Sequence, residues 1–144
     1  MNILVTGGAG FIGSNVCDEY RSLGHEVFVI DNLSNSKDSY INDDVKFFKR
    51  DIYTDDLEYI FKENNIDIIN HYAAQINLRD SIKNPVNDLR INVEGTLNLL
   101  QLAVKYNVKK FIFASSGGAI YGEQEYFPAD EHHRLNPISP YGIS

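Results

Sequence analysis

The sequence has one cysteine, one methionine and no tryptophan among its 144 residues. The lone Cys17 excludes an internal disulfide framework and suits a reducing compartment, so we predict a cytoplasmic protein. Basic residues are also scarce, because 13 lysines and arginines against 20 acidic residues leave a net charge of −7. An acidic chain lacks the cationic face that general nucleic-acid binding requires, so we expect no nucleic-acid partner.

Long hydrophobic runs are missing as well. No apolar stretch approaches the roughly 18 residues of a membrane-spanning helix, so we expect no membrane partner. The N-terminus also lacks the basic segment and the small-residue cleavage site of a signal peptide. A chain of 144 residues can form one domain with a real core, but it is too short for two ordinary domains.

Short apolar runs alternate with helical periodicity along the chain. Strands are predicted over Asn2–Thr6, Glu26–Ile30, Val45–Phe48, Ile66–His71 and Lys110–Ser115. Helices are predicted over Phe11–Leu23, over Asp55–Asn64 with Thr54 as its cap, and from Pro85 to about Tyr106. We expect the last helix to turn one apolar stripe inward, formed by Val86, Leu89, Val93, Leu97, Leu100 and Val104.

Strands that are apolar on both faces and alternate with helices indicate an α/β fold. Crossover connections in such sheets are right-handed, which predicts a doubly wound parallel sheet of the Rossmann type. The expected strand order is 3-2-1-4-5. The sixth strand of the usual arrangement has no residues here, so we expect the sheet to be incomplete at its C-terminal edge.

Glycines at positions 7, 10 and 13 lie between the first strand and the first helix. Gly7 permits a tight turn, Gly10 lets the backbone approach a pyrophosphate, and Gly13 allows close packing of helix on strand. The N–H groups at the start of the helix would bind the phosphates. A glycine-rich turn that binds nothing is the alternative, but the flanking strand and helix favour a dinucleotide site.

Asp31 follows the second strand, 18 residues after Gly13. A carboxylate there can accept hydrogen bonds from both ribose hydroxyls of an adenosine, and it repels a 2′-phosphate. The loop after Asp31 contains Lys37 and no arginine. These features favour NAD over NADP as the cofactor, with an ordinary loop aspartate as the alternative reading.

Two further segments follow strands at the same predicted edge of the sheet. Asp51 and Ile52 could hold the adenine amino group and ring face, although helix capping explains them about equally well. Ala73 and Ala74 leave room for a cofactor, although small residues also pack well in cores. His71 fits a hydrogen-bonded structural role better than a catalytic one. Ser115, Ser116 and Tyr141 could converge beside a nicotinamide, where a serine would bind the reacting oxygen and the tyrosine would exchange its proton.

Several segments of the sequence match a known family in order. These are residues 1–15, 31–34, 51–52, 71–75, 92–96, 115–123 and 139–144. Over its whole length the chain therefore resembles the extended short-chain dehydrogenase/reductase family, and within it the sugar-nucleotide epimerases. The resemblance implies an isomerase of nucleotide-sugar and galactose metabolism, with NAD as cofactor and a UDP-sugar as substrate. It would interconvert UDP-glucose and UDP-galactose through a 4-keto intermediate.

The resemblance also implies roles for the matching residues. The pyrophosphate loop would comprise Gly7, Gly10, Phe11, Ile12 and Gly13. The adenosine would be surrounded by Asp31, Asn32, Ser34, Asp51 and Ile52. The rest of the cofactor would be lined by Ala73, Ala74, Gln75, Asn92 and Ser115. Tyr141 would be the acid/base with Ser116 as its partner, Ser115 being held in reserve, and no metal ligands are expected.

The chain departs from the family pattern at position 117 and at its end. Gly117 replaces a third hydroxyl residue that many epimerases carry, which favours Ser116 as the catalytic serine. Gly118 and Ala119 occupy positions where the related 4,6-dehydratases place Asp-Glu, so they speak against that activity.

The lysine of the family's Y-x-x-x-K motif would fall at position 145, just after Ser144. Complete members are about twice this length, so we expect residues 1–144 to be a truncated NAD-binding domain without the C-terminal substrate domain. Such a fragment should be inactive alone and marginally soluble, whereas the full-length protein should be a homodimer. The alternatives are an epimerase of UDP-glucuronate or UDP-N-acetylhexosamine, and a non-catalytic NAD-binding module.

Overall fold

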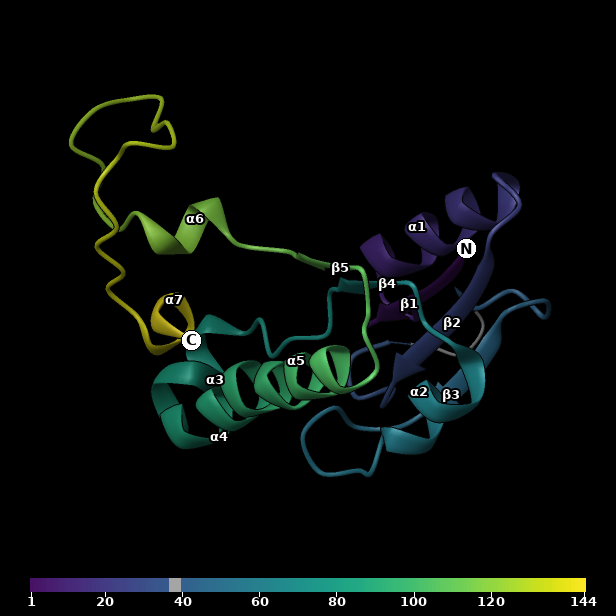
Figure 1. Ribbon diagram of the computed structural model, residues 1–144. Helices are drawn as coiled ribbons and strands as arrows, with labels where there is room; N and C mark the ends of the chain where they lie inside the picture. Colours follow the sequence, from purple (N-terminus) through teal and green to yellow (C-terminus); the bar gives the residue numbers. More distant parts are fainter. Residues whose placement is uncertain (37–39) are drawn as a thin grey trace.

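The computed structural model describes residues 1–36 and 40–144, and its centre is a five-stranded parallel sheet (Figure 1). The strands are β1 (Asn2–Thr6), β2 (Glu26–Asp31), β3 (Lys46–Lys49), β4 (Ile68–His71) and β5 (Lys110–Phe113). They pair in the order β3-β2-β1-β4-β5, and every pair is parallel. The doubly wound fold and the predicted strand order are therefore confirmed.

Helices cover both faces of this sheet. They are α1 (Phe11–Ser22), α2 (Glu58–Asn64), α3 (Leu78–Lys83), α4 (Pro85–Leu89), the π-helical turn η2 (Arg90–Glu94), α5 (Gly95–Lys105), α6 (Gly117–Ile120) and α7 (Pro140–Ile143). Figure 1 shows α1 on one side of the sheet and α2 and α5 on the other. None of these helices is long and apolar enough to cross a membrane.

Alternate side chains of β1 build two separate cores, because successive residues of a strand point to opposite faces. Ile3 and Val5 pack with Cys17 on the α1 side. Leu4 packs on the other side, in the cluster that contains residues of α2 and α5. Burial raises the pKa of the Cys17 thiol to about 12, and the neighbouring Asp18 adds to the rise. Cys17 is thus a small buried residue of this core.

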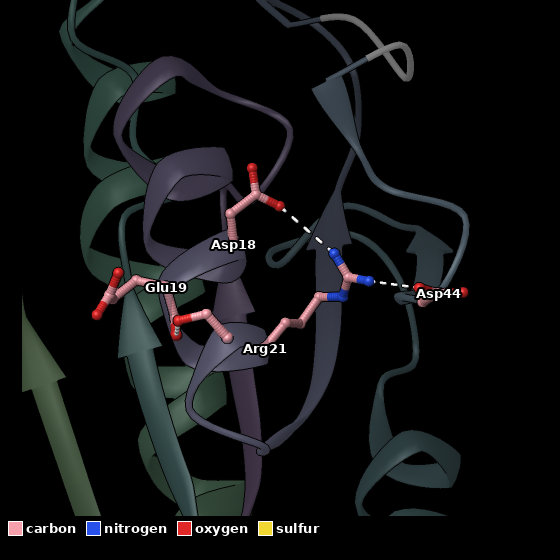
Figure 2. A network of polar contacts seen from close by, with 5 residues as sticks. Asp18, Glu19, Arg21 and Asp44 are labelled. Carbon is pink, nitrogen blue, oxygen red and sulfur yellow. Dashed lines mark hydrogen bonds and ion pairs between the residues drawn. The ribbon is translucent and has the colours of Figure 1, made fainter.

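An exposed ionic contact ties α1 to the connection before β3 (Figure 2). Arg21, in the last turn of α1, reaches Asp18 at 3.6 Å and also forms a hydrogen-bonded ion pair with Asp44. A cation suits the C-terminal end of a helix, where carbonyl groups lack partners. Exposed pairs of this kind contribute about 0–1 kcal/mol each, so the contact orients the loop more than it stabilises the fold.

The predicted inner stripe of the long helix is wrong. Its members lie mostly on the exposed face, and Val104 is 79% exposed. The buried residues of α4 and α5 are instead Asp88, Gly95, Leu99, Leu102 and Ala103. This helix is apolar on two sides, so hydrophobicity alone does not select a face. Close packing does, because a Cβ on Gly95 would lie 2.8 Å from the Ile52 side chain.

The predicted cap at Thr54 is also wrong. Helix α2 begins at Glu58, and its N-cap is Leu57, which makes no side-chain capping bond. The residues before it form turns instead, because Asp51 Oδ1 accepts hydrogen bonds from the N–H groups of Tyr53 and Thr54. Strand limits shift by up to two residues, and the helix from Pro85 is interrupted by the π-helical turn η2.

Candidate functional site

The glycine loop lies between β1 and α1, where each glycine meets a different demand. Gly7 has a positive φ of 68°, and its carbonyl accepts the N–H of Gly10 at 3.0 Å. A Cβ on Gly13 would lie 2.3 Å from the Gly7 carbonyl oxygen, so only glycine fits there. The predicted tight turn and the predicted close packing of helix on strand are both present.

The first turn of α1 leaves its N–H groups free of side-chain caps. Gly10 is the N-cap and makes no side-chain hydrogen bond, and the first turn contains no acidic residue. Phe11 and Ile12 follow with exposed side chains, Phe11 at 84%. A helix start of this kind offers its N–H groups and a positive dipole end to an anion such as a pyrophosphate.

Asp31 ends β2 beside this loop and is buried. Its Oδ2 accepts the N–H of Ala9 at 3.1 Å, and its Oδ1 accepts the N–H of Leu33 and the Ser36 hydroxyl, each at 2.8 Å. The carboxylate is therefore held in one orientation at the carboxyl edge of the sheet. Lys37, which entered the choice between NAD and NADP, lies outside the described residues.

The remaining residues predicted to surround the adenosine lie next to Asp31. Asn32 donates a hydrogen bond from Nδ2 to Asp51 Oδ2 at 2.7 Å, and its Oδ1 accepts the N–H of Ser34 at 2.9 Å. Ile52 is different, because its side chain is buried in the core against Gly95. The structure thus brings Asp31, Asn32, Ser34 and Asp51 together, with Ile52 beneath them.

A cavity of about 190 Å³ opens beyond the ends of β4 and β5. Its walls include six of the predicted site residues, namely Ala73, Ala74, Asn92, Ser115, Ser116 and Tyr141. Ala73 also borders the glycine loop, since a Cβ on Gly7 would lie 2.7 Å from its backbone nitrogen. The cavity and the glycine loop therefore adjoin each other at the point where the strand order reverses, which is where ligands bind in doubly wound folds.

Two short helices carry the candidate catalytic side chains. Ser116 is the N-cap of α6, and Tyr141 lies in α7, whose own N-cap Ser139 accepts the N–H of Gly142 at 3.0 Å. Figure 1 shows α7 beside α3 and α4, beyond the carboxyl ends of the strands. Ser116 and Tyr141 come from distant parts of the chain and line the same cavity.

His71 is one of the residues that line this cavity, and it belongs to a chain of hydrogen bonds. The Thr96 hydroxyl donates to the Asn92 carbonyl, so its oxygen accepts from His71 Nε2 at 2.9 Å. Nδ1 of His71 then accepts from the Thr6 hydroxyl at 2.6 Å, and Thr6 Oγ1 accepts the N–H of Ala73 at 3.2 Å. Burial lowers the pKa of His71 from 6.5 to about 4, so the ring is neutral near pH 7. The predicted structural role of His71 fits this geometry.

Asn92 fixes the loop after β4. It lies in the π-helical turn η2, a feature often found at functional sites. Its Oδ1 accepts the N–H of Gln75 at 2.8 Å, and its Nδ2 donates to the Gln75 carbonyl at 3.1 Å. The side chain of Asn92 thus forms two hydrogen bonds with the backbone of Gln75, and it orients the loop that carries Ala73 and Ala74.

Three polar residues of this network were not predicted from the sequence. Thr6 ends β1, Thr96 bonds His71, and Asp88 is 1% exposed on α4. A signal for two of them exists, because Asp88, Asn92 and Thr96 are spaced four residues apart in the predicted helix. Polar residues at that spacing share one helical face.

The chain's own geometry fits a dinucleotide. The glycine loop has no space for additional Cβ atoms, the start of α1 is uncapped, and Asp31 sits at the end of the second strand. A model of the NAD-dependent epimerase/dehydratase family matches residues 3–144. The chain therefore belongs to the NAD-dependent epimerase/dehydratase family, whose members use NAD.

This chain is similar to several UDP-glucose 4-epimerases. The structure of the Thermotoga maritima enzyme with UDP-glucose has a TM-score of 0.96 and 47% identity, covering 99% of this chain and 47% of its own. The Thermus thermophilus enzyme in complex with NAD has a TM-score of 0.94 and 42% identity, with 99% and 47% covered. The Mycolicibacterium smegmatis enzyme is 38% identical, with 98% and 47% covered. The chain thus spans about half the length of these relatives.

Proposed function

We propose that this chain is the NAD-binding part of a protein that interconverts UDP-glucose and UDP-galactose through a 4-keto intermediate. The observation that carries the proposal is the cavity that joins Ala73, Ser116 and Tyr141 beside the glycine loop. The similarity to UDP-glucose 4-epimerases over 98–99% of the chain supports it.

The proposed roles follow from the position of each group. The first-turn N–H groups of α1 hold the pyrophosphate, and Asp31 accepts hydrogen bonds from the adenosine ribose. When bound, NAD supplies a reversible hydride acceptor. Tyr141 takes the proton of the sugar C4 hydroxyl as C4 is oxidised and returns it afterwards. Ser116 donates a hydrogen bond to the same oxygen and keeps it within reach of Tyr141.

The test uses the full-length protein that carries this chain, offered UDP-galactose, UDP-glucuronate and UDP-N-acetylgalactosamine in turn. We expect turnover of UDP-galactose to UDP-glucose. Turnover of only one of the other sugars would replace the proposed substrate with a related one. A protein that binds NAD and converts none of them would be a non-catalytic binding module. We expect the 144-residue chain alone to be inactive, and measurable turnover by it would contradict the proposal.

We also propose that the full-length protein is a homodimer. The outer face of α4, η2 and α5 presents a continuous set of exposed apolar side chains, Val86, Leu89, Leu97, Leu100 and Val104. A second copy of the same face would bury it in a two-fold interface. Leu97→Glu should shift the sedimentation of the protein to that of a monomer, and Gln124→Glu, an exposed change outside α4, η2 and α5, serves as its control. A dimer unaffected by Leu97→Glu would contradict this interface.

The proposed location is the cytoplasm. The lone cysteine is reduced and buried, which suits a reducing compartment. Separation of cell fractions followed by detection of the protein tests this, and recovery outside the cytoplasm would contradict it.

A further inference from the structure

Asp88 carries a buried carboxylate whose hydrogen bonds reach two segments beside the cavity. One segment contains Ala73 and Ala74, and the other contains Tyr141. It is 1% exposed, and no ion pair among the described residues includes it. Its Oδ2 accepts the hydroxyl of Ser144 at 2.7 Å, and its Oδ1 accepts Nε2 of Gln75 at 2.7 Å. A buried polar side chain is costly unless hydrogen bonds compensate it, so these two contacts are what make the burial of Asp88 tolerable.

The Ser144 contact holds the segment that contains Tyr141. Ser144 directly follows α7, and its oxygen also accepts Nδ2 of Asn92 at 3.0 Å. The hydroxyl is therefore held between Asp88 and Asn92, one as acceptor and one as donor. At the other end of α7, Ser139 caps the helix. Tyr141 thus lies in a segment that Ser139 and Ser144 hold by hydrogen bonds, and α7 packs on α3 and α4.

The hydrogen bond from Gln75 to Asp88 holds the loop after β4, which carries Ala73 and Ala74. Gln75 follows Ala73 and Ala74, and Asn92 already grips its backbone. Asp88 adds a bond to the Gln75 side chain, so one carboxylate joins the loop after β4 to Ser144 beside α7. Asp88 itself does not line the cavity. Its contacts fix the two segments relative to each other, and Asp88 does not itself reach a ligand in the cavity.

We propose that Asp88 is a positioning residue that places the phenol of Tyr141 over the cavity through Ser144. This inference rests on the proposed function, in which Tyr141 exchanges the proton of the sugar hydroxyl. A small displacement of a reacting group is costly, because catalysis depends on near-attack geometry. Loss of the Asp88 contacts should therefore slow the hydride-transfer step and leave the binding of NAD intact.

The experiment compares four variants of the full-length protein, namely Asp88→Ala, Asp88→Asn, Ser144→Ala and the double alanine variant. Asp80→Ala, which removes an exposed carboxylate from the neighbouring helix α3, is the control. Three quantities are measured for each. They are the affinity for NAD, the rate at which the nicotinamide absorbance changes in a single turnover with UDP-galactose, and amide hydrogen exchange in a peptide covering residues 139–144.

We expect Asp88→Ala and Ser144→Ala each to slow hydride transfer about 10- to 100-fold, with NAD affinity within about twofold of the parent. The double variant should be slowed less than the product of the two single effects, because both changes break the same Asp88–Ser144 contact. Asp88→Asn should recover part of the rate, since its amide oxygen still accepts the Ser144 hydroxyl. Exchange in residues 139–144 should accelerate in the alanine variants and not in Asp80→Ala.

Unchanged exchange and an unchanged rate in a folded Asp88→Ala variant would overturn the proposal. A rate that falls only in proportion to NAD affinity would also overturn it, because that pattern indicates general damage to the fold. If Asp88→Ala fails to fold, Ser144→Ala decides, since it removes one hydroxyl from a partly exposed residue. Faster exchange in the variants of a protein that converts no UDP-sugar would support the anchoring and overturn the proposed function alone.

Discussion

Asp31 and Ala9 are joined by a hydrogen bond of 3.1 Å from the backbone N–H of Ala9 to Oδ2 of the carboxylate. The bond connects the end of β2 to the glycine loop after β1. The same carboxylate is the group proposed to bind the adenosine ribose. One side chain therefore shapes the loop and serves the cofactor, so changes at Asp31 should affect both.

Replacing the Asp31 carboxylate should weaken NAD binding and reduce the preference for NAD over NADP. In Asp31→Asn the side chain loses its charge and can no longer accept hydrogen bonds at both ends. We expect affinity for NAD to fall by about 10- to 150-fold, in line with losing a charged hydrogen bond of about 1.5–3 kcal/mol. Calorimetric titration with each dinucleotide measures this. Asp43→Asn, an exposed change in the same connection, is the control, and equal effects of the two variants would contradict the role of Asp31.

Gly13→Ala should disrupt the loop itself. The new Cβ would lie 2.3 Å from the Gly7 carbonyl oxygen and 2.7 Å from Gly8 Cα, which are backbone atoms that cannot rotate away. Overpacking of this kind costs about 1–3 kcal/mol, and we expect NAD binding to be lost as α1 is pushed from the turn. Urea unfolding measures the stability. Gly118→Ala, where no atom lies within 4 Å of the new Cβ, should unfold like the parent.

Stability should fall between pH 7 and pH 5 because of His71. Its pKa is 6.5 ordinarily and about 4 when folded, so the unfolded chain takes up the proton first as the pH falls. The stabilisation is thus present above pH 6.5 and is lost as the pH falls toward 4. For a shift of this size we expect a loss of about 2 kcal/mol between pH 7 and pH 5.

Urea unfolding at the two pH values tests the His71 prediction. His71→Gln should be less stable at pH 7 because the bonds to Thr6 and Thr96 are altered. It should show a much flatter dependence on pH over the same range. A variant with the same pH dependence as the parent would assign the effect to other groups.

Cys17 should resist thiol reagents while the protein is folded. Its pKa of about 12 keeps the thiol protonated near pH 8, and the side chain is one of the buried residues of α1. It is the only cysteine of the 144-residue chain, so labelling reports on this site alone. We expect labelling only after addition of denaturant. Rapid labelling of the native chain would show that α1 is not packed as described.

The sheet and the glycine loop could be predicted from the sequence because local patterns determine them. Runs such as Asn2–Thr6 are apolar on both faces, which requires helices on both sides of a parallel sheet. Gly7 and Gly13 occupy positions that tolerate no Cβ, and their spacing shows this without a structure. Asp31 could be placed because the end of a strand is a recognisable position.

The inward face of the long helix could not be predicted in the same way. Val104 and Leu102 are both apolar, yet only Leu102 is buried, and the choice depends on how closely Gly95 approaches Ile52 across the fold. Asp88 was missed for a related reason. Its partners Gln75 and Ser144 lie 13 and 56 residues away. The four-residue spacing of Asp88, Asn92 and Thr96 indicates a shared polar face, but it does not identify these partners.

The most direct test of the account is the activity of the full-length protein with Tyr141 replaced by phenylalanine. The parent should convert UDP-galactose to UDP-glucose. Tyr141→Phe should bind NAD as the parent does, and its turnover should fall by about 10²–10⁴-fold, the usual contribution of a general acid or base. A parent protein that converts no UDP-sugar, or a Tyr141→Phe variant that turns over at the parental rate, would contradict the account.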